Sequence, residues 1–323
     1  MKKLILISSA VAMLFSACQK NSLINTDTPS AITQRSCGSM EVLAEQMKAD
    51  PTLESSMSAY ETVVQNNIKA IENGTSNYRL VNGVIEIPVV VNVLYRTAAE
   101  NISQAQIQSQ IDVLNEDFNA TNADYTKVPS TFSGVKANVG IRFVLDQVIR
   151  KSTTKTSWKT DDAMKKSTKG GINPTTPTTK LNLWVCTLSG GILGYAQFPG
   201  GASATDGVVI LNTGFGRTGT AAAPYNKGRT ATHEVGHWLN LRHIWGDATC
   251  GSDLVNDTPL HNTANYGCPA AGHKSTCSGT PIEMTMNYMD YTDDACMYMF
   301  SAGQKARILA TFATGGPRAT FAQ

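Results

Sequence analysis

Residues 233–243 read His-Glu-Val-Gly-His-Trp-Leu-Asn-Leu-Arg-His. On a helix, His233 and His237 project from the same face, one turn apart, because they are four residues apart. Two imidazoles at this spacing can bind one Zn²⁺ ion. Glu234 lies beside them and is better placed to reach a water molecule on the metal than the metal itself. The stretch therefore predicts a helix that carries two metal ligands and a general base.

A third ligand must come from outside that helical face. His243 follows His237 by six residues, so it reaches the same ion only if the helix ends and the chain turns sharply between them. Asn240 stands at this turn, and after Gly it is the residue that best tolerates the left-handed backbone conformation. Two alternatives stay open: a pair of surface histidines without a metal, and a downstream acidic ligand, for which Glu283 is the candidate. The remaining histidines are expected in loops outside the site: His261 and His273.

The stretch resembles the zinc motif of the metzincin metallopeptidases, His-Glu-x-x-His-x-x-Gly-x-x-His followed by a Met-turn, with Asn240 in the place of the usual Gly. Among the metzincins it is most similar to the pappalysin family, which tolerates Asn at that position. Residues 287–291, Asn-Tyr-Met-Asp-Tyr, are similar to that family's Met-turn. Residues 193–199 and 257–259 resemble the small bacterial enzymes of the ulilysin type. The resemblance begins at about residue 79 and is strongest over 181–311.

Periodicity along the chain indicates strands at 84–95, 141–145, 181–188, 194–198 and 208–211, and helices at 103–118, from 230 and at 301–312. The resemblance implies that these elements form an α/β fold of the metzincin type. It would have a twisted mixed sheet of five strands, backed by the helix at 103–118 and by the zinc helix. The catalytic part would comprise subdomains 79–243 and 244–323, the second being irregular and ending in a helix.

The resemblance also implies the chemistry of a zinc endopeptidase that acts on proteins or peptides. Zinc on three imidazoles would bind the attacking water, Glu234 would act as its general base, and Tyr291 would stabilise the oxyanion. Met289 would form an apolar floor under the ligands. The substrate would pair with an edge strand near 194–198. The mature enzyme is expected to be a monomer without a nucleic-acid partner.

Ulilysin-type enzymes cut before Arg, which requires an acidic pocket. The candidates for this pocket follow the Met-turn: Asp290, Asp293 and Asp294. The resemblance implies a calcium site in the same half of the chain, with oxygen ligands that suit a hard cation. Its candidate ligands are Asp253, Val255, Asp257 and Thr258, the alternative being two aspartates that only form turns.

The N-terminus predicts export. Two lysines precede an uncharged apolar run over 4–17, which is shorter than the ~20 residues of a membrane-spanning helix and typical of a secretory signal. The run leads into Cys18 in a sequence similar to a bacterial lipobox, although Phe15 replaces the usual Leu. We expect a signal over 1–18 with a lipid on Cys18, the alternative being an ordinary signal peptide. The precursor would then be an exported bacterial lipoprotein of the cell envelope, bound to the membrane through the lipid alone.

Residues 19–78 are predicted to be a polar tether followed by a prosegment. Residues 40–72 have a helical pattern that Pro51 divides in two. Cleavage of the Tyr78–Arg79 bond would release the mature enzyme into the surroundings of the cell.

The cysteines divide into two groups. Cys37, before the prosegment helices, resembles the cysteine switch of latent metzincins, in which a thiolate takes the open position on zinc. The alternatives are an unused thiol and a disulfide with Cys186, which we otherwise expect to be a buried free thiol. Four later cysteines allow three connectivities, and a second zinc site is their rival use. The resemblance implies the pairs Cys250–Cys277 and Cys268–Cys296.

Composition sets the outer limits. Of the 323 residues, 41% are hydrophobic and 16% charged, which predicts a packed core. A net charge of +2 excludes a strongly basic nucleic-acid binder. The basic, Thr-rich segment 150–180 is expected to be a solvated loop. The alternative functions are a non-catalytic cell-surface binding protein on a zincin scaffold and an adhesin with a structural zinc.

Overall fold

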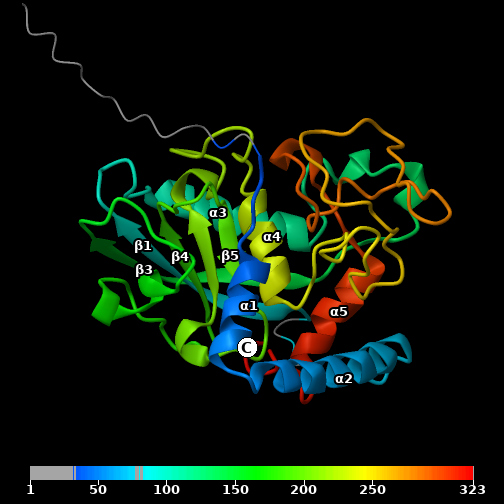
Figure 1. The fold of residues 1–323 in the computed structure, drawn as a ribbon, viewed down its shortest axis with the longest axis horizontal. Helices are drawn as coiled ribbons and strands as arrows, with labels where there is room; N and C mark the ends of the chain where they lie inside the picture. Colours follow the sequence, from blue (N-terminus) through cyan, green and yellow to red (C-terminus); the bar gives the residue numbers. More distant parts are fainter. Residues whose placement is uncertain (1–31, 33, 77–79, 81–82, 323) are drawn as a thin grey trace, which may run out of the picture. The chain divides into compact units, whose positions relative to one another are not determined.

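A five-stranded sheet with the order β3-β1-β4-β6-β5 lies at the centre of the computed structural model, which describes residues 32, 34–76, 80 and 83–322. Its strands are β3 (Ile141–Ser152), β1 (Ile85–Tyr95), β4 (Leu181–Cys186), β6 (Val208–Leu211) and β5 (Gly194–Ala196). The first four are parallel, and β5 pairs antiparallel with β6 at the edge (Figure 1). The sheet confirms the predicted mixed sheet of five strands.

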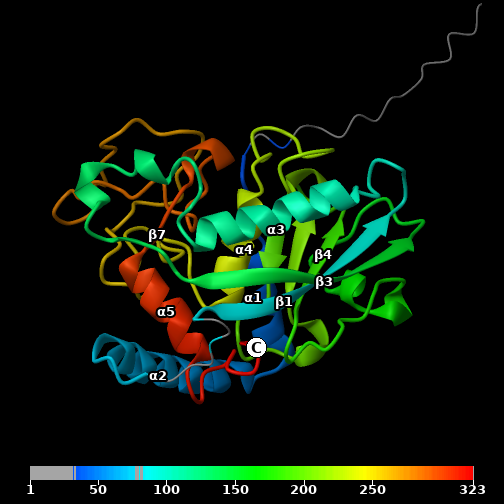
Figure 2. The same ribbon diagram turned by 180° about the vertical axis from the view of Figure 1, so that it is seen from behind.

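Helices α3 (Gln104–Phe118) and α4 (Arg229–Trp238) pack on the same face of this sheet. Figure 2 shows α3 in front of the sheet. Ser103 caps α3 by accepting a hydrogen bond from the backbone N–H of Gln106, as its position before the helix predicts. The apolar stripe of α3 is buried against alternate side chains of β1 and consists of Ile107, Ile111, Leu114 and Phe118. This packing fixes α4, and with it the predicted zinc helix, against the sheet.

Segment 150–180 covers the opposite face, and it is a largely exposed loop, as predicted, with a buried apolar part that was not predicted. Its apolar side chains are buried in a second core cluster: Trp158, Met164 and Ile172. Lys165 is buried too, because its ammonium pairs with the Asp162 carboxylate at 2.9 Å and donates to the Thr205 carbonyl at 2.8 Å. The buried positions of the segment follow its apolar residues, and the number of basic residues did not indicate them.

The chain after the histidine motif is mostly irregular and ends in α5 (Ala302–Phe312), as predicted. Ser301 and Gln304 form a capping box at the start of α5. A short ladder between β2 (Lys136–Ala137) and β7 (Phe300–Ser301) ties this start to the body of the molecule.

Two disulfides cross-link the irregular part, and two thiols of the described residues are free. The bonded pairs are those that the resemblance implies, Cys250–Cys277 and Cys268–Cys296. Cys37 and Cys186 are both free and buried, which rules out the alternative of a disulfide between them.

Two helices precede the sheet, α1 (Ser39–Ala49) and α2 (Leu53–Glu72), with the predicted break near Pro51. Helix α1 lies against β5, and α2 packs along α5 (Figures 1 and 2). The two helices thereby contact both the sheet edge and the C-terminal helix. Among the described residues, no helix combines the length and apolar character that crossing a membrane requires.

Candidate active site

Three histidines converge at the C-terminal half of α4. His233 and His237 lie on one face of the helix, which ends at Trp238. Asn240 has a φ of +71°, so it makes the left-handed turn that the sequence requires, and the chain brings His243 back to the same point. The Nε2 atom of His237 lies 3.2 Å from that of His233 and 3.1 Å from that of His243. All three side chains are buried.

The second nitrogen of each imidazole faces an oxygen acceptor. The Nδ1 atoms of His233, His237 and His243 lie 2.7 Å from the Tyr288 carbonyl, 2.8 Å from the Leu241 carbonyl and 2.5 Å from the Asp247 carboxylate, respectively. Because these oxygens accept hydrogen bonds, Nδ1 carries the proton and Nε2 presents its lone pair. Three lone pairs aimed at one point repel each other unless a cation lies between them. Three neutral imidazoles, each oriented by such a partner, are a donor set that fits Zn²⁺.

The Met-turn packs against the zinc helix. Met289 is fully buried, and its carbonyl accepts a hydrogen bond from the backbone N–H of Ile244, next to the third histidine. A Cβ atom at Gly236 would lie 2.5 Å from the Met289 sulfur. Gly236 is therefore required for the close approach of the Met-turn to the helix.

Glu234 is buried on α4, with its carboxylate against Cys37 and Ser39. Its Oε2 accepts a hydrogen bond from the Ser39 hydroxyl at 2.9 Å and lies 3.3 Å from the Cys37 sulfur. Burial raises the pKa of Glu234 to about 7, a value that suits a group that exchanges protons near neutral pH. The Tyr291 hydroxyl accepts a hydrogen bond from the backbone N–H of Cys37 at 3.2 Å.

Residues 36–38 lie along β5 in the parallel direction. The backbone N–H of Leu193 donates to the Ser36 carbonyl, and that of Gly38 donates to the Gly194 carbonyl, both at 2.9 Å. The Cys37 sulfur and one nitrogen of each of the three histidines lie within 4.8 Å of one another. The structure thus brings Cys37, the candidate switch residue, next to the three histidines.

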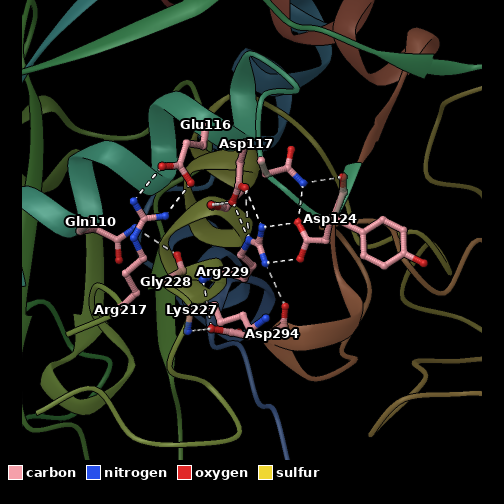
Figure 3. A network of polar contacts seen from close by, with 12 residues as sticks. Gln110, Glu116, Asp117, Asp124, Arg217, Lys227, Gly228, Arg229 and Asp294 are labelled. Carbon is pink, nitrogen blue, oxygen red and sulfur yellow. Dashed lines mark hydrogen bonds and ion pairs between the residues drawn. The ribbon is translucent and has the colours of Figure 1, made fainter. Parts of the chain in front are cut away.

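Arg35 is buried against Asp294. Its guanidinium lies 2.6 Å from the Asp294 Oδ1 atom, with both side chains buried, and it also donates to the Thr292 carbonyl. The other carboxylate oxygen of Asp294 accepts from the backbone N–H groups of Lys227 at 2.7 Å and Arg229 at 3.2 Å (Figure 3). The backbone therefore orients Asp294 so that Oδ1 faces the guanidinium.

Arg229, the first residue of α4, connects Asp294 to the helix that carries His233 and His237. Its guanidinium donates to the carboxylates of Asp117 and Asp124 and to the carbonyl of Asp294 (Figure 3). Asp117 also accepts from the Thr232 hydroxyl of α4 at 2.7 Å. The position of Asp294 relative to the histidines is thus set by a buried network on one helix.

Glu283 and Asp290 form a separate buried cluster with Asn265 and His261. The Asn265 amide donates to both carboxylates, at 2.6 and 3.0 Å, and His261 Nδ1 lies 3.6 Å from Asp290. Neither carboxylate belongs to the group of described residues that could hold a metal with the three histidines. His261 and His273 lie in loops as expected, but the burial of His261 was not foreseen.

The candidate calcium ligands make hydrogen bonds of their own. Asp253 accepts from the Thr258 hydroxyl at 2.9 Å and from the Val255 N–H at 3.1 Å. Asp257 accepts from the Ser301 hydroxyl at 2.6 Å and from a backbone N–H in the first turn of α5. Asp257 therefore stabilises the N-terminus of α5, and the calcium site stays a prediction.

Sequence reasoning missed the roles of three residues at the cleft, namely Arg35, Ser39 and Arg229. Arg35 and Ser39 lie two residues before and after Cys37. If Cys37 reaches the metal, these two residues must lie near the metal as well. This was an available signal. Arg229 had none, because its partners come from distant parts of the chain.

The sheet, the helix with its Glu and two His, the third His after a left-handed Asn and the Met-turn together define the metzincin class of metallopeptidases. The family model described as pregnancy-associated plasma protein-A matches residues 179–313. The extracellular metalloprotease of Pyricularia oryzae is 35% identical over 76% of this chain and 80% of its own length. The chain therefore belongs to the pappalysin family of metalloproteases.

Two solved structures from Tannerella forsythia are similar. Mature mirolysin in complex with a cleaved peptide is 46% identical, with a TM-score of 0.72 over 74% of this chain and 96% of its own. A mutant of promirolysin is 41% identical, with a TM-score of 0.79 over 89% of this chain and 97% of its own. The match to promirolysin covers more of this chain than the match to mature mirolysin.

Proposed function

We propose that this chain is a secreted zinc endopeptidase, made as a latent zymogen, that cuts peptide bonds before a basic residue. The observation that carries the proposal is the convergence of three buried Nε2 atoms beside a buried carboxylate, Glu234. Relatives named extracellular metalloproteases support export and peptide substrates. The likeness to promirolysin supports a zymogen.

Each residue of the site has a distinct task. His233, His237 and His243 would hold zinc, which supplies a Lewis acid that polarises water and the scissile carbonyl. Glu234 takes the proton of the attacking water and returns it to the leaving nitrogen. Tyr291, whose hydroxyl faces Cys37 in the latent form, donates to the oxyanion once the prosegment has left.

Arg35 marks the pocket for the basic residue of the substrate. A substrate that pairs antiparallel with β5 runs opposite to the prosegment, which is parallel to β5. The residue after the cut then takes the place of Arg35 and meets Asp294. Of the other acidic candidates, Asp290 is engaged by Asn265, and Asp293 is only half-buried.

Three prosegment contacts would keep the enzyme latent. Cys37 would supply a further ligand to zinc, the Ser39 hydroxyl donates a hydrogen bond to the Glu234 carboxylate, and Arg35 fills the specificity pocket. The Ser39 hydroxyl also accepts a hydrogen bond from the Ala196 N–H of β5 at 2.8 Å, so it is held on both sides. The prosegment runs parallel to β5, opposite to the substrate, so its backbone does not have the orientation in which a peptide bond is cleaved.

Replacing Cys37 by Ala should convert the latent precursor into one that is active or matures faster, because no thiolate then competes for the metal. Mass spectrometry over time and hydrolysis of an Arg-containing peptide measure both effects. Cys186→Ala is the matched control, since it removes the other buried free thiol outside the cleft. A Cys37→Ala precursor as latent as the parent would overturn the switch.

The proposed function itself is tested on the chain from residue 19 onward. We expect it to trim itself near residue 79 and then to cleave peptides before Arg. A zinc chelator should abolish this cleavage, and added Zn²⁺ should restore it. A protein that binds zinc but never cleaves itself or any peptide, even after trypsin removes the prosegment, would instead support the binding-scaffold alternative. The Tyr78–Arg79 bond, the signal and the candidate lipid site Cys18 lie outside the described residues.

A further inference from the structure

We infer that the mature enzyme recognises an acidic side chain on the N-terminal side of the cut, through Arg307 and Arg242. The inference rests on the proposed function and extends it to a class of substrates. Its starting point is Glu61 on α2, whose two carboxylate oxygens lie 2.8 and 2.6 Å from the two terminal nitrogens of Arg307. A carboxylate thus already occupies this position in the zymogen, in the bidentate geometry that Arg favours.

The guanidinium is held by the catalytic part of the chain. Arg307 belongs to α5, and its Nε donates to the Asn240 carbonyl at 2.7 Å. Asn240 is the left-handed residue between the second and third histidines. When α2 leaves with the prosegment, this hydrogen bond stays, so the two terminal nitrogens keep their direction and lose their carboxylate partner.

The position adjoins the cleft. A cavity of about 330 Å³ lies between the prosegment and the catalytic part. Its wall on the catalytic side consists of Phe198, Pro199, Asn240, Arg242, Arg307 and Pro317. The Phe198 ring lies 5.3 Å from the ring of His237, so this wall begins beside a metal ligand. Met40 and Leu43 of α1 cover the Phe198 side in the zymogen.

The direction of the chain assigns this groove to the residues before the cut. From Cys37 the prosegment continues to Ser39, which contacts β5, and then to the side chains that cover Phe198. A substrate that runs the opposite way has its N-terminal residues there and the residue after the cut at Asp294.

Charge decides which side chain the groove prefers. The acidic residues that line the cavity are Glu54 and Glu61, and both leave with α2. The catalytic side contributes Arg242 and Arg307, together with the apolar surface of Phe198. The open groove is therefore positive beside an apolar wall, and it favours a Glu side chain over Gln and disfavours Lys.

The test uses the chain from residue 19, matured by its own cleavage or by limited trypsin digestion, and a set of quenched fluorescent peptides. Each peptide has Arg after the cut and carries Glu, Gln or Lys at one of the positions two to five before it. At one position we expect kcat/KM to be about tenfold higher for Glu than for Gln, and lowest for Lys. Arg307→Gln should bring the Glu/Gln ratio at that position close to one.

Two further variants separate the site from general effects. Arg242→Gln should lower the same ratio without removing the hydrogen bond to Asn240. Arg217→Gln removes another bidentate arginine, which pairs with Glu116 at 2.6 and 2.7 Å outside this groove, and it should leave the ratio unchanged. If Arg307→Gln fails to fold, the Glu/Gln ratio of kcat/KM in the parent enzyme and in the Arg242→Gln variant still tests the inference. Equal rates for Glu and Gln at every position in an active enzyme would overturn the inference alone. An enzyme that cleaves no peptide would overturn the proposed function, and the inference with it.

Discussion

Glu234→Ala should lower kcat/KM of the matured enzyme about 10³-fold while leaving the metal in place. The three histidines keep their Nδ1 partners in this variant, because none of those partners involves Glu234. What disappears is the only task that the proposal gives to Glu234, the transfer of a proton from the attacking water to the leaving nitrogen. Peptide hydrolysis gives the rate, and zinc content by atomic absorption gives the occupancy.

Glu234→Gln is the matched variant, because it keeps the size of the side chain and removes its basicity. The two variants should be similarly inactive and should contain about one zinc each, and their precursors should fail to trim themselves. Near-normal hydrolysis by either variant would contradict the assignment of the general base. Loss of zinc together with activity would mean that the carboxylate acts on the metal site instead.

Asp294→Asn should remove the preference for Arg after the cut, lowering kcat/KM for such peptides about 10²-fold. The amide keeps an oxygen for the N–H groups of Lys227 and Arg229, so its NH₂ group is turned towards the guanidinium of the substrate. Peptides with a neutral residue at this position should be cut at an unchanged rate. The ratio of the two rates measures the effect free of changes in folding or zinc content.

Latency provides an independent measurement of the same residue. Arg35 pairs with Asp294 in the zymogen, so Asp294→Asn should also speed the loss of the prosegment. Asp293→Asn is the control, because Asp293 is half-buried and adjacent in the chain. An unchanged Arg preference in the Asp294 variant would return the choice to Asp290 or Asp293.

Much of the fold could be predicted because local patterns and global packing agree. The helices at 103–118 and 301–312 and the five strands were predicted from spacing alone, since each element buries one periodic set of side chains. The prediction was incomplete at segment 150–180, where it missed the buried apolar side chains. Its apolar residues follow no short period, and a face of the sheet that needs cover cannot be seen from the segment itself.

By itself, the sequence determined the chemistry of the centre. Two histidines one turn apart, a Glu beside them and an Asn where the helix must end are local features, and a helix and one turn are enough to bring them together. Only the tertiary structure decided that Asp294 rather than its neighbours meets Arg35, that the Ser39 hydroxyl donates to Glu234 and that Arg307 binds the carboxylate of Glu61 on α2. These contacts join residues up to 259 positions apart, and their geometry depends on how α1, α2, α4 and α5 pack, which no local pattern contains.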